Sequence, residues 1–204
     1  MSVPFSSSET LQNLMRAFAG ESQARNRYTF AAEVCRTQKL PVLEAVFQFT
    51  AGQELAHAGV FYRHMAPEND RNIPIDAAYP VNCTNDVTEL LRQAAHNEQE
   101  EHGQVYPAFA EIARREGFPA IAASFSQIAA IEGVHSRRFQ QLLELWQRDA
   151  LFVSDVECGW MCLNCGHILT AKEAPGLCPV CHHEQGYFIR LELAPYSGPA
   201  LLEP

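Results

Sequence analysis

Two copies of a glutamate–histidine motif could hold metal ions between helices. Each copy places a histidine three residues after a glutamate, so that both side chains point the same way from a helix. The copies are Glu54-Leu-Ala-His57 and Glu132-Gly-Val-His135, and a single glutamate, Glu21 or Glu98, precedes each at nearly the same interval. This ligand set is typical of a dinuclear iron or manganese site in a helical bundle. The simpler alternative is a set of core polar residues without a ligand.

The glutamates of this set fall on apolar stripes. Glu132 and His135 recur with Ile128 and Phe139 at steps of three and four residues, which is one face of a helix. Three other glutamates lie on stripes of the same kind: Glu21, Glu54 and Glu98. A buried, unpaired carboxylate costs several kcal/mol, and few Arg or Lys residues share these stripes. Bound cations would remove this cost, because metal ligands are deprotonated and the metal neutralises them.

The segment "AHNEQEEHGQVYP" contains three glutamates within four positions. Glu98 and Glu101 are three residues apart and belong to the apolar stripe. Glu100 lies roughly 200° around the helix from Glu98 and is expected to face water. Glu101 has no counterpart in the first half of the chain, where Ala24 stands three residues after Glu21. It is therefore a seventh candidate ligand, present on one half of the site.

Four of the seven cysteines form two Cys-x-x-Cys pairs twelve residues apart. Such pairs favour tetrahedral thiolate coordination of iron or zinc; they are Cys162, Cys165, Cys178 and Cys181. A structural zinc ribbon is the alternative to a redox iron site. Cys158 does not fit the pair spacing and is expected to be a spare thiol, and Cys35 and Cys83 are expected to be buried or free thiols.

Four helices are expected to carry the glutamates. The first begins at a capping box formed by Ser6 and Glu9, and the four extend over about 6–36, 42–65, 86–115 and 119–148. Residues 67–83 hold three prolines and form one long connection, while the others are short. One long crossover is typical of the ferritin-like four-helix bundle. Pro107 removes a backbone donor inside the third helix and predicts a local kink.

Composition places the chain among globular proteins. It has 204 residues, 47% of them hydrophobic, and a net charge of −9, which argues against nucleic acid or an anionic membrane as a partner. The first residues do not resemble a signal peptide, and an apolar run long enough to span a bilayer is not expected. We expect a cytoplasmic protein with two domains, a helical bundle over 1–148 and a linker with a β-rich metal domain over 149–204.

Taken together, these motifs resemble those of rubrerythrins. The resemblance covers about residues 9–193 and rests on six segments: "GESQARNRY", "ELAH", "NEQEEHGQVYPAFAEIARREG", "IEGVHSRRF", "WMCLNCG" and "APGLCPVC". It implies a ferritin-like domain followed by a rubredoxin-like domain. One departure is His167 in "CGH", where rubredoxin knuckles usually carry a tyrosine.

The resemblance implies a role for each candidate residue. It assigns the di-iron site to Glu21, Glu54, His57, Glu98, Glu101, Glu132 and His135, with Glu54 and Glu132 bridging two irons. Glu101 and His57 match positions that exchange as iron ligands between oxidation states. The four cysteines of the two pairs would hold one iron, with zinc as the alternative. Tyr28 and Tyr106 resemble tyrosines beside the ligands, although plain core packing explains their spacing equally well.

The same resemblance implies an activity and partners. We expect a non-haem peroxidase that reduces hydrogen peroxide to water in oxidative-stress defence, with the thiolate iron relaying electrons. A homodimer and an electron-donating reductase or rubredoxin are the expected partners. Two rival functions use the same residues. One is a ferroxidase or iron-storage protein, and the other is a non-redox helical module with a structural zinc ribbon.

Overall fold

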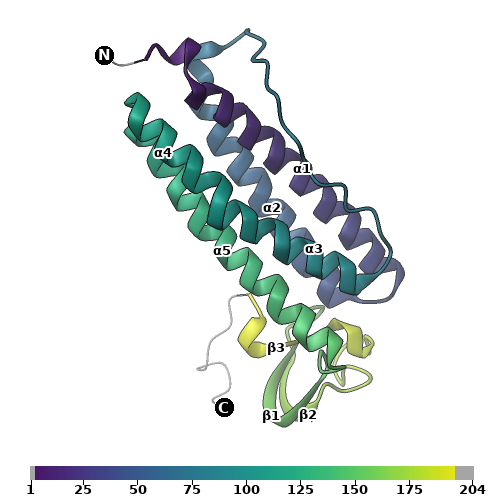
Figure 1. Ribbon diagram of the computed structural model, residues 1–204. Helices are drawn as coiled ribbons and strands as arrows, with labels where there is room; N and C mark the ends of the chain where they lie inside the picture. The colour runs from purple at the N-terminus through teal and green to yellow at the C-terminus, as the bar shows by residue number, and fades with distance from the viewer. Residues whose placement is uncertain (1–2, 196–204) are drawn as a thin grey trace.

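Four helical members lie side by side in the structure, a computed structural model that describes residues 3–195 (Figure 1). Three members are single helices: α1 (Glu9–Thr37), α2 (Pro41–His64) and α5 (Pro119–Gln147). The remaining member is divided into α3 (Val87–Glu100) and α4 (Tyr106–Glu116), which the π-helical turn η3 (Glu101–Val105) joins. The predicted four-helix bundle is confirmed.

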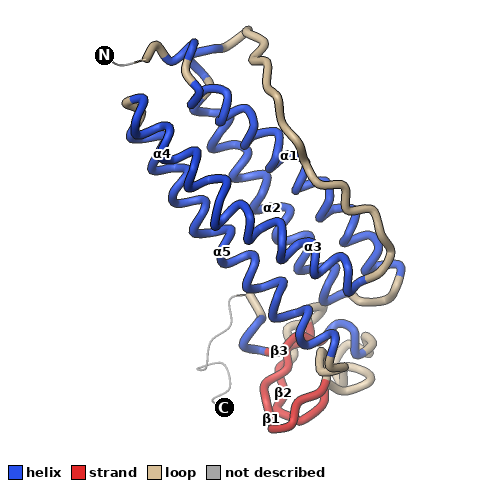
Figure 2. The backbone as a smooth tube through the Cα atoms, in the orientation of Figure 1, coloured by secondary structure: helices blue, strands red, loops and turns tan. Residues whose placement is uncertain are grey.

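One long connection sets the order of the helices. The turn between α1 and α2 and the turn between α4 and α5 are short, so each pair is antiparallel (Figure 2). Residues 65–86, here called the crossover segment, join α2 to α3 and run along α1 (Figure 1). This segment contains only the short 3-10 turn η2 (Ala66–Glu68). The single long crossover therefore matches the prediction.

The start of α1 differs from the predicted capping box. Ser6 lies in the 3-10 turn η1 (Phe5–Ser7), and Ser8 is the residue whose side chain caps the helix by accepting from the Leu11 amide. Phe5 packs edge-on against Phe118 at 5.3 Å between ring centroids. This contact with the start of α5 favours an extra turn before the helix, which moves the cap from Ser6 to Ser8.

A carboxylate from α4 completes the cap of α1. Glu116 accepts hydrogen bonds from the Glu9 amide at 3.1 Å, the Thr10 amide at 2.8 Å and the Thr10 hydroxyl at 2.6 Å. Burial opposes the charge on this carboxylate, but the bonds from Thr10 and Glu9 outweigh it and hold its pKa below the usual range. An anion at a helix N-terminus also interacts favourably with the helix dipole.

We expect Glu116→Ala to destabilise the fold by about 1–2 kcal/mol at pH 7, because two amides at the helix start lose their acceptor. Since the pKa of Glu116 is depressed in the folded state, its contribution is complete above the unfolded pKa and is lost as the pH falls through the folded one. Urea unfolding at pH 7 and pH 3 measures this. Glu111→Ala, an exposed change on the same helix, is the control. An equal loss at both pH values would contradict the ionised cap.

Two apolar cores lie along the bundle, one on each side of a polar layer. Tyr28, Phe47 and Phe139 pack with ring centroids 5.1–5.9 Å apart in the core beside the α1–α2 turn. Phe61 and Phe125 pack at 5.0 Å in the other core. Because these large rings surround the layer on both sides, side chains within it are removed from water.

The third member of the bundle changes register at η3. Up to Glu98 the buried residues follow the predicted stripe, but beyond η3 the buried residues are Tyr106, Ala110 and Ala113. Val105, Phe109 and Ile112, which continue the spacing of Glu98 and Glu101 at steps of three and four residues, are only half-buried. A π-helical turn contains one residue more than an α-helical turn, so every later residue is displaced by one position. The kink predicted at Pro107 takes the form of this wider turn, in which the Tyr106 amide donates to Glu101.

A small sheet follows the bundle. Strands β1 (Val153–Cys162), β2 (Ile168–Glu173) and β3 (Phe188–Arg190) form an antiparallel sheet in the order β2-β1-β3. Trp160 is fully buried there, and its indole donates to the Ala171 carbonyl at 3.0 Å. Ile189 and Leu191 join the core beside the α1–α2 turn, so the sheet packs against that end of the bundle.

The predicted division at residue 148 lies between α5, which ends at Gln147, and β1, which begins at Val153. The division itself stays a prediction, and the outer limits of both predicted domains lie outside the described residues. None of the helices in residues 3–195 combines the length and hydropathy that crossing a lipid bilayer requires.

Candidate metal centre

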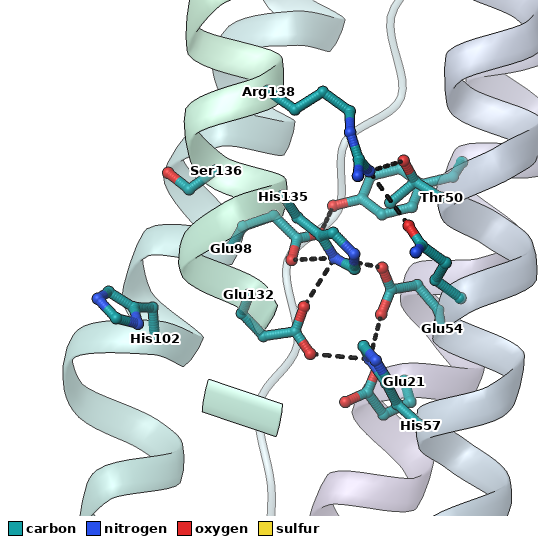
Figure 3. A network of polar contacts seen from close by, with 12 residues as sticks. Glu21, Thr50, Glu54, His57, Glu98, His102, Glu132, His135, Ser136 and Arg138 are labelled. Atoms are coloured by element: carbon teal, nitrogen blue, oxygen red, sulfur yellow. Dashed lines mark hydrogen bonds and ion pairs between the residues drawn. The ribbon is translucent and has the colours of Figure 1, made fainter. Parts of the chain in front are cut away.

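Six of the predicted ligands meet in the polar layer between the two cores. They come from all four members of the bundle: Glu21 from α1, Glu54 and His57 from α2, Glu98 from α3, and Glu132 and His135 from α5 (Figure 3). None is more than 7% exposed. Their ligand atoms form two groups, each with every atom within 4.8 Å of the others, and Glu54 and Glu132 belong to both groups. Two shared carboxylates between two groups of ligands are the arrangement that a bridged dinuclear site requires.

Each histidine faces three carboxylates through one ring nitrogen. His57 Nδ1 lies 2.9 Å from Glu132 Oε1, 3.2 Å from Glu54 Oε2 and 3.8 Å from a Glu21 oxygen. His135 Nδ1 lies 2.8 Å from Glu132 Oε2, 3.1 Å from Glu54 Oε1 and 3.4 Å from a Glu98 oxygen. A ring nitrogen offers one hydrogen or one lone pair, so it cannot satisfy three acceptors at once.

The polar atoms of this cluster are better placed to bind cations than to hydrogen-bond with one another. Several have no well-formed hydrogen bond: one oxygen each of Glu21, Glu54 and Glu98, both oxygens of Glu132, and both ring nitrogens of His135. Buried polar side chains normally have such partners. Carboxylate oxygens and imidazole nitrogens that converge while lacking partners are the donor set that iron, manganese or zinc accepts. The residues therefore fit a pair of metal ions.

Electrostatics in the cluster oppose its charge when no cation is bound. Burial, followed by repulsion from the neighbouring carboxylates, raises the pKa of Glu21 and of Glu98 well above the usual value. Burial disfavours charge on the histidines too, but the carboxylates outweigh it and raise the pKa of His57 to about 9 and of His135 to about 11. Metal ions would displace these protons, because ligands bind in the deprotonated form.

Two tyrosines hydrogen-bond the outer carboxylates in a crossed arrangement. The Tyr28 hydroxyl of α1 donates to Glu98 of α3, and the Tyr106 hydroxyl of α4 donates to Glu21 of α1 at 2.6 Å. Burial and the adjacent carboxylates raise the pKa of both phenols. Tyr28 follows Glu21 by seven residues, whereas Tyr106 follows Glu98 by eight. The extra residue of η3 absorbs this difference and brings the two halves of the site into equivalent positions.

Glu101 does not join the six clustered ligands. It begins η3 and is half-buried, and it borders a cavity of about 250 Å³ together with Arg16, Tyr79 and Tyr106. Burial, then repulsion from Glu132 and Glu54, raises its pKa to about 8. Its predicted role as a seventh ligand stays a prediction. Glu100, by contrast, is exposed as predicted.

The η3 turn is braced against α5 by His102. His102 Nδ1 lies 2.7 Å from the Ala129 carbonyl, outside the ligand cluster (Figure 3). A Cβ atom on Gly133 would lie 2.8 Å from that same ring nitrogen. The glycine inside the second Glu-x-x-His motif therefore leaves room for the ring that fixes the residue after Glu101.

We expect Gly133→Ala to destabilise the protein by about 1–3 kcal/mol, because the added methyl group displaces the His102 ring. In a His102→Ala background the same change should stabilise by up to about 1 kcal/mol, since alanine is a better helix former than glycine. Urea unfolding of the four proteins in this cycle measures the reversal. Gly52→Ala is the control, because its Cβ would have no neighbour within 4 Å. A loss of the same size in both backgrounds would contradict the brace.

A second group of ligands lies in the sheet domain. The sulfurs of Cys162, Cys165, Cys178 and Cys181 all lie within 4.8 Å of one another, and the pairs Cys162–Cys181 and Cys165–Cys178 are 3.7 Å apart. Disulfide sulfurs are about 2.0 Å apart, whereas a tetrahedron with metal–sulfur bonds of about 2.3 Å has edges of about 3.8 Å. The spacing therefore fits a tetrahedral iron or zinc ion.

The two cysteine pairs form equivalent turns. The Gly166 amide donates to the Cys162 carbonyl, and the His182 amide donates to the Cys178 carbonyl. Gly166 and His182 have positive φ values of 75° and 59°. The backbone amide of His183 lowers the pKa of Cys181 to about 5. His167 contributes its carbonyl, which accepts from the Cys162 amide.

The other three cysteines lie outside this cluster, as predicted. Cys35 is buried, and burial followed by repulsion from Glu44 raises its pKa to about 12. Cys83 is exposed in the crossover segment, and Cys158 is half-buried in β1. Sequence reasoning also missed Arg138, whose guanidinium donates to Thr50 and Gln53 beside the cluster (Figure 3); one arginine on an amphipathic helix gives no signal of its own.

Comparison with known proteins matches both parts of the chain to family descriptions. Residues 12–143 match the family described as "Rubrerythrin", and residues 160–189 match "Rubrerythrin, rubredoxin-like domain". The first match covers the helices that hold the six clustered ligands, and the second covers all four cysteines of the tetrahedral group.

Individual relatives are similar over most of their length. A rubrerythrin of Porphyromonas gingivalis is 44% identical over 181 residues, which cover 89% of each chain. A rubrerythrin of Nitratidesulfovibrio vulgaris is 35% identical and covers 89% of this chain and 93% of its own. Among solved structures, fully reduced, all-ferrous nigerythrin superposes with a TM-score of 0.61 at 29% identity, covering 93% of this chain and 88% of the other.

Proposed function

The chain belongs to the rubrerythrin family, and we propose that it reduces hydrogen peroxide to water at the carboxylate–histidine centre. The observation that carries this proposal is the pair of ligand groups that share Glu54 and Glu132. Two irons bound there would act as Lewis acids toward peroxide and supply together the two electrons that breaking its O–O bond requires. Iron at both sites is itself part of the proposal.

The surrounding residues would hold the ligands and supply protons. Reduction of one peroxide consumes two protons, and each must reach an oxygen buried between the two apolar cores. Glu101 borders the cavity beside the centre, and a carboxyl group at this position would pass protons from solvent to the buried oxygens. Tyr106 borders the same cavity and donates to Glu21, so it keeps that carboxylate oriented.

Glu101 and His57 are proposed to alternate as ligands when the oxidation state changes. His57 lies within the cluster in this structure, whereas Glu101 lies outside it. Glu101 begins η3, a π-helical turn with wider backbone spacing, whereas the other ligands lie on α-helices. An anionic ligand would suit the more highly charged ferric state.

Electron supply is proposed to come from a rubredoxin-type iron on a second copy of the chain. Along α5, His135 and Gln147 are roughly 18 Å apart, and the sheet lies beyond that end of the bundle (Figure 1). A head-to-tail homodimer would shorten this path. Exposed apolar side chains on α2 and α5 could form its interface; they are Phe49, Leu55, Tyr62, Ile131 and Val134. A reductase or rubredoxin would reduce the thiolate iron. Four of the seven cysteines are placed to bind metal and the other three are outside disulfides, which favours a reducing compartment such as the cytoplasm.

Stopped-flow spectroscopy of the fully reduced protein mixed with hydrogen peroxide tests the proposal. Peroxide should oxidise the reduced centre in a fast phase, and the absorption of oxidised thiolate iron should return within the turnover time as its electron moves to that centre. If peroxide is consumed while that absorption stays absent, the relay is wrong. If peroxide is not consumed, the peroxidase proposal is wrong.

A further inference from the structure

A cavity with a mostly apolar lining and a few polar groups opens beside the carboxylate–histidine centre. It has a volume of about 250 Å³ and lies between α1, the crossover segment and η3; we call it the access chamber. Arg16, Tyr79 and Glu101 line it, and Ala17 forms part of its α1 wall. The six clustered ligands are at most 7% exposed, whereas Glu101 is half-buried and borders the chamber. The chamber is therefore a route from solvent to the edge of the centre.

Tyr79 covers the side of the chamber next to α1. Its hydroxyl donates to the Arg16 carbonyl at 2.6 Å. A Cβ atom on Gly20 would lie 3.4 Å from the Tyr79 ring, so the ring packs directly over the helix backbone at this position. Gly20 immediately precedes Glu21, one of the six clustered ligands. The ring thus lies over the part of α1 that leads into the centre.

Three further side chains of α1 hold the crossover segment over the chamber. Arg16 Nε donates to the Asp76 carbonyl at 3.1 Å, Gln23 donates to the Pro80 carbonyl at 2.8 Å, and Arg27 donates to Asn82 at 2.9 Å. These bonds flank Tyr79 on both sides along the chain. These bonds hold the crossover segment against α1 and thereby position the Tyr79 ring beside the chamber.

We propose that peroxide reaches the centre through the access chamber, and that Tyr79 is a specificity-determining residue that admits hydrogen peroxide and restricts bulky organic hydroperoxides. The inference rests on the proposed peroxidase function. Hydrogen peroxide is nearly as small as water, and both donates and accepts hydrogen bonds, so it can take the place of a water molecule beside Arg16 and Glu101. An alkyl group would strip water from Arg16 and Glu101 without replacing those bonds.

Steady-state kinetics with two peroxides test the role of the ring. Both reactions consume two electrons and two protons; hydrogen peroxide gives two waters, and tert-butyl hydroperoxide gives tert-butanol and water. We expect Tyr79→Ala to raise kcat/KM for tert-butyl hydroperoxide relative to hydrogen peroxide by about tenfold, the usual effect of one steric contact on selectivity. Tyr79→Phe is the matched control, since it keeps the ring and loses only the bond to Arg16, and its ratio should change less than twofold.

Binding without turnover provides a second measurement. Zinc suits the same carboxylate and imidazole ligands but has no redox chemistry, so the zinc-loaded protein can be titrated with tert-butanol as an unreactive analogue. The 13C methyl signal of Ala17, which is 3% exposed, should shift in Tyr79→Ala and stay in place in the parent and in Tyr79→Phe. If the alanine variant is poorly folded, Tyr79→Leu can replace it. This variant keeps an apolar cover over Gly20 and should give an intermediate shift of the Ala17 signal.

The outcomes separate this inference from the proposed function. An unchanged peroxide ratio in Tyr79→Ala, or an Ala17 signal that responds equally in all variants, overturns the role of Tyr79. If no variant reduces either peroxide but the Ala17 signal shifts as expected, the peroxidase proposal fails and the chamber assignment is supported.

Discussion

Replacing Glu132 with alanine is expected to abolish binding of the metal pair and to lower the proposed peroxidase activity by at least about 10³-fold. Glu132 contributes ligand atoms to both groups, and its two oxygens face different histidines at 2.9 Å and 2.8 Å. A carboxylate at the edge of the cluster would bind one metal ion, so its loss should leave the second metal ion bound. Because Glu132 shares this position in both groups with Glu54 alone, its loss should remove both metal ions.

Metal analysis measures this expectation. The parent should carry two metal ions per chain in the bundle and one at the four cysteines, whereas Glu132→Ala should retain only the latter. Glu144→Ala, an exposed change on the same helix, is the control and should keep all three ions. A Glu132→Ala protein that still holds two ions in the bundle would show that this carboxylate does not bridge them.

The second large effect is expected from Cys165→Ala. Cys165 is the exposed member of the tetrahedral group, so its removal disturbs packing less than removal of the buried Cys162 or Cys178. The variant should lose the thiolate-bound metal, because alanine offers no ligand. Steady-state turnover with an external electron donor should fall by at least about 10²-fold, while a single turnover of the chemically reduced bundle centre should remain.

Comparison of steady-state turnover with a single turnover tests whether the cysteine site relays electrons to the bundle centre. Cys158→Ala is the control, since Cys158 lies in the same sheet but outside the cluster, and both regimes should match the parent. If Cys165→Ala turns over with an external donor at the parent rate, the thiolate site has no part in electron supply and is structural. If single turnover is lost as well, the cysteine site is needed to maintain the bundle centre itself.

The sequence predicts the ligand cluster well because its signal is local and repeated. A glutamate and a histidine three residues apart share a helix face whatever surrounds them, and two such pairs buried in apolar stripes would be costly without a bound cation. The structure brings together all six residues of this repeated pattern. The paired cysteines are similarly local, since each turn is set by six consecutive residues with equivalent backbone hydrogen bonds.

Features that depend on distant contacts were predicted less well. Beyond Glu98 the buried residues lie one position later than α-helical spacing predicts. The register change at η3 is held by His102 against the α5 carbonyl of Ala129, and no local pattern indicates it. The helix cap was placed at Ser6 instead of Ser8 because Phe5 packs against Phe118, over 100 positions away in the chain. No sequence pattern predicts the access chamber, because Tyr79 belongs to a proline-rich connection whose path is set by side chains of α1.

Anomalous X-ray scattering at the iron absorption edge, from crystals of protein purified from its native cells, tests the central claim most directly. We predict two peaks in the polar layer, one near His57 and Glu21 and the other near His135 and Glu98, with Glu54 and Glu132 contacting both. A further peak should lie among the four cysteine sulfurs. A cysteine peak accompanied by no density, or by a single peak, between Glu54 and Glu132 would contradict the bridged dinuclear centre.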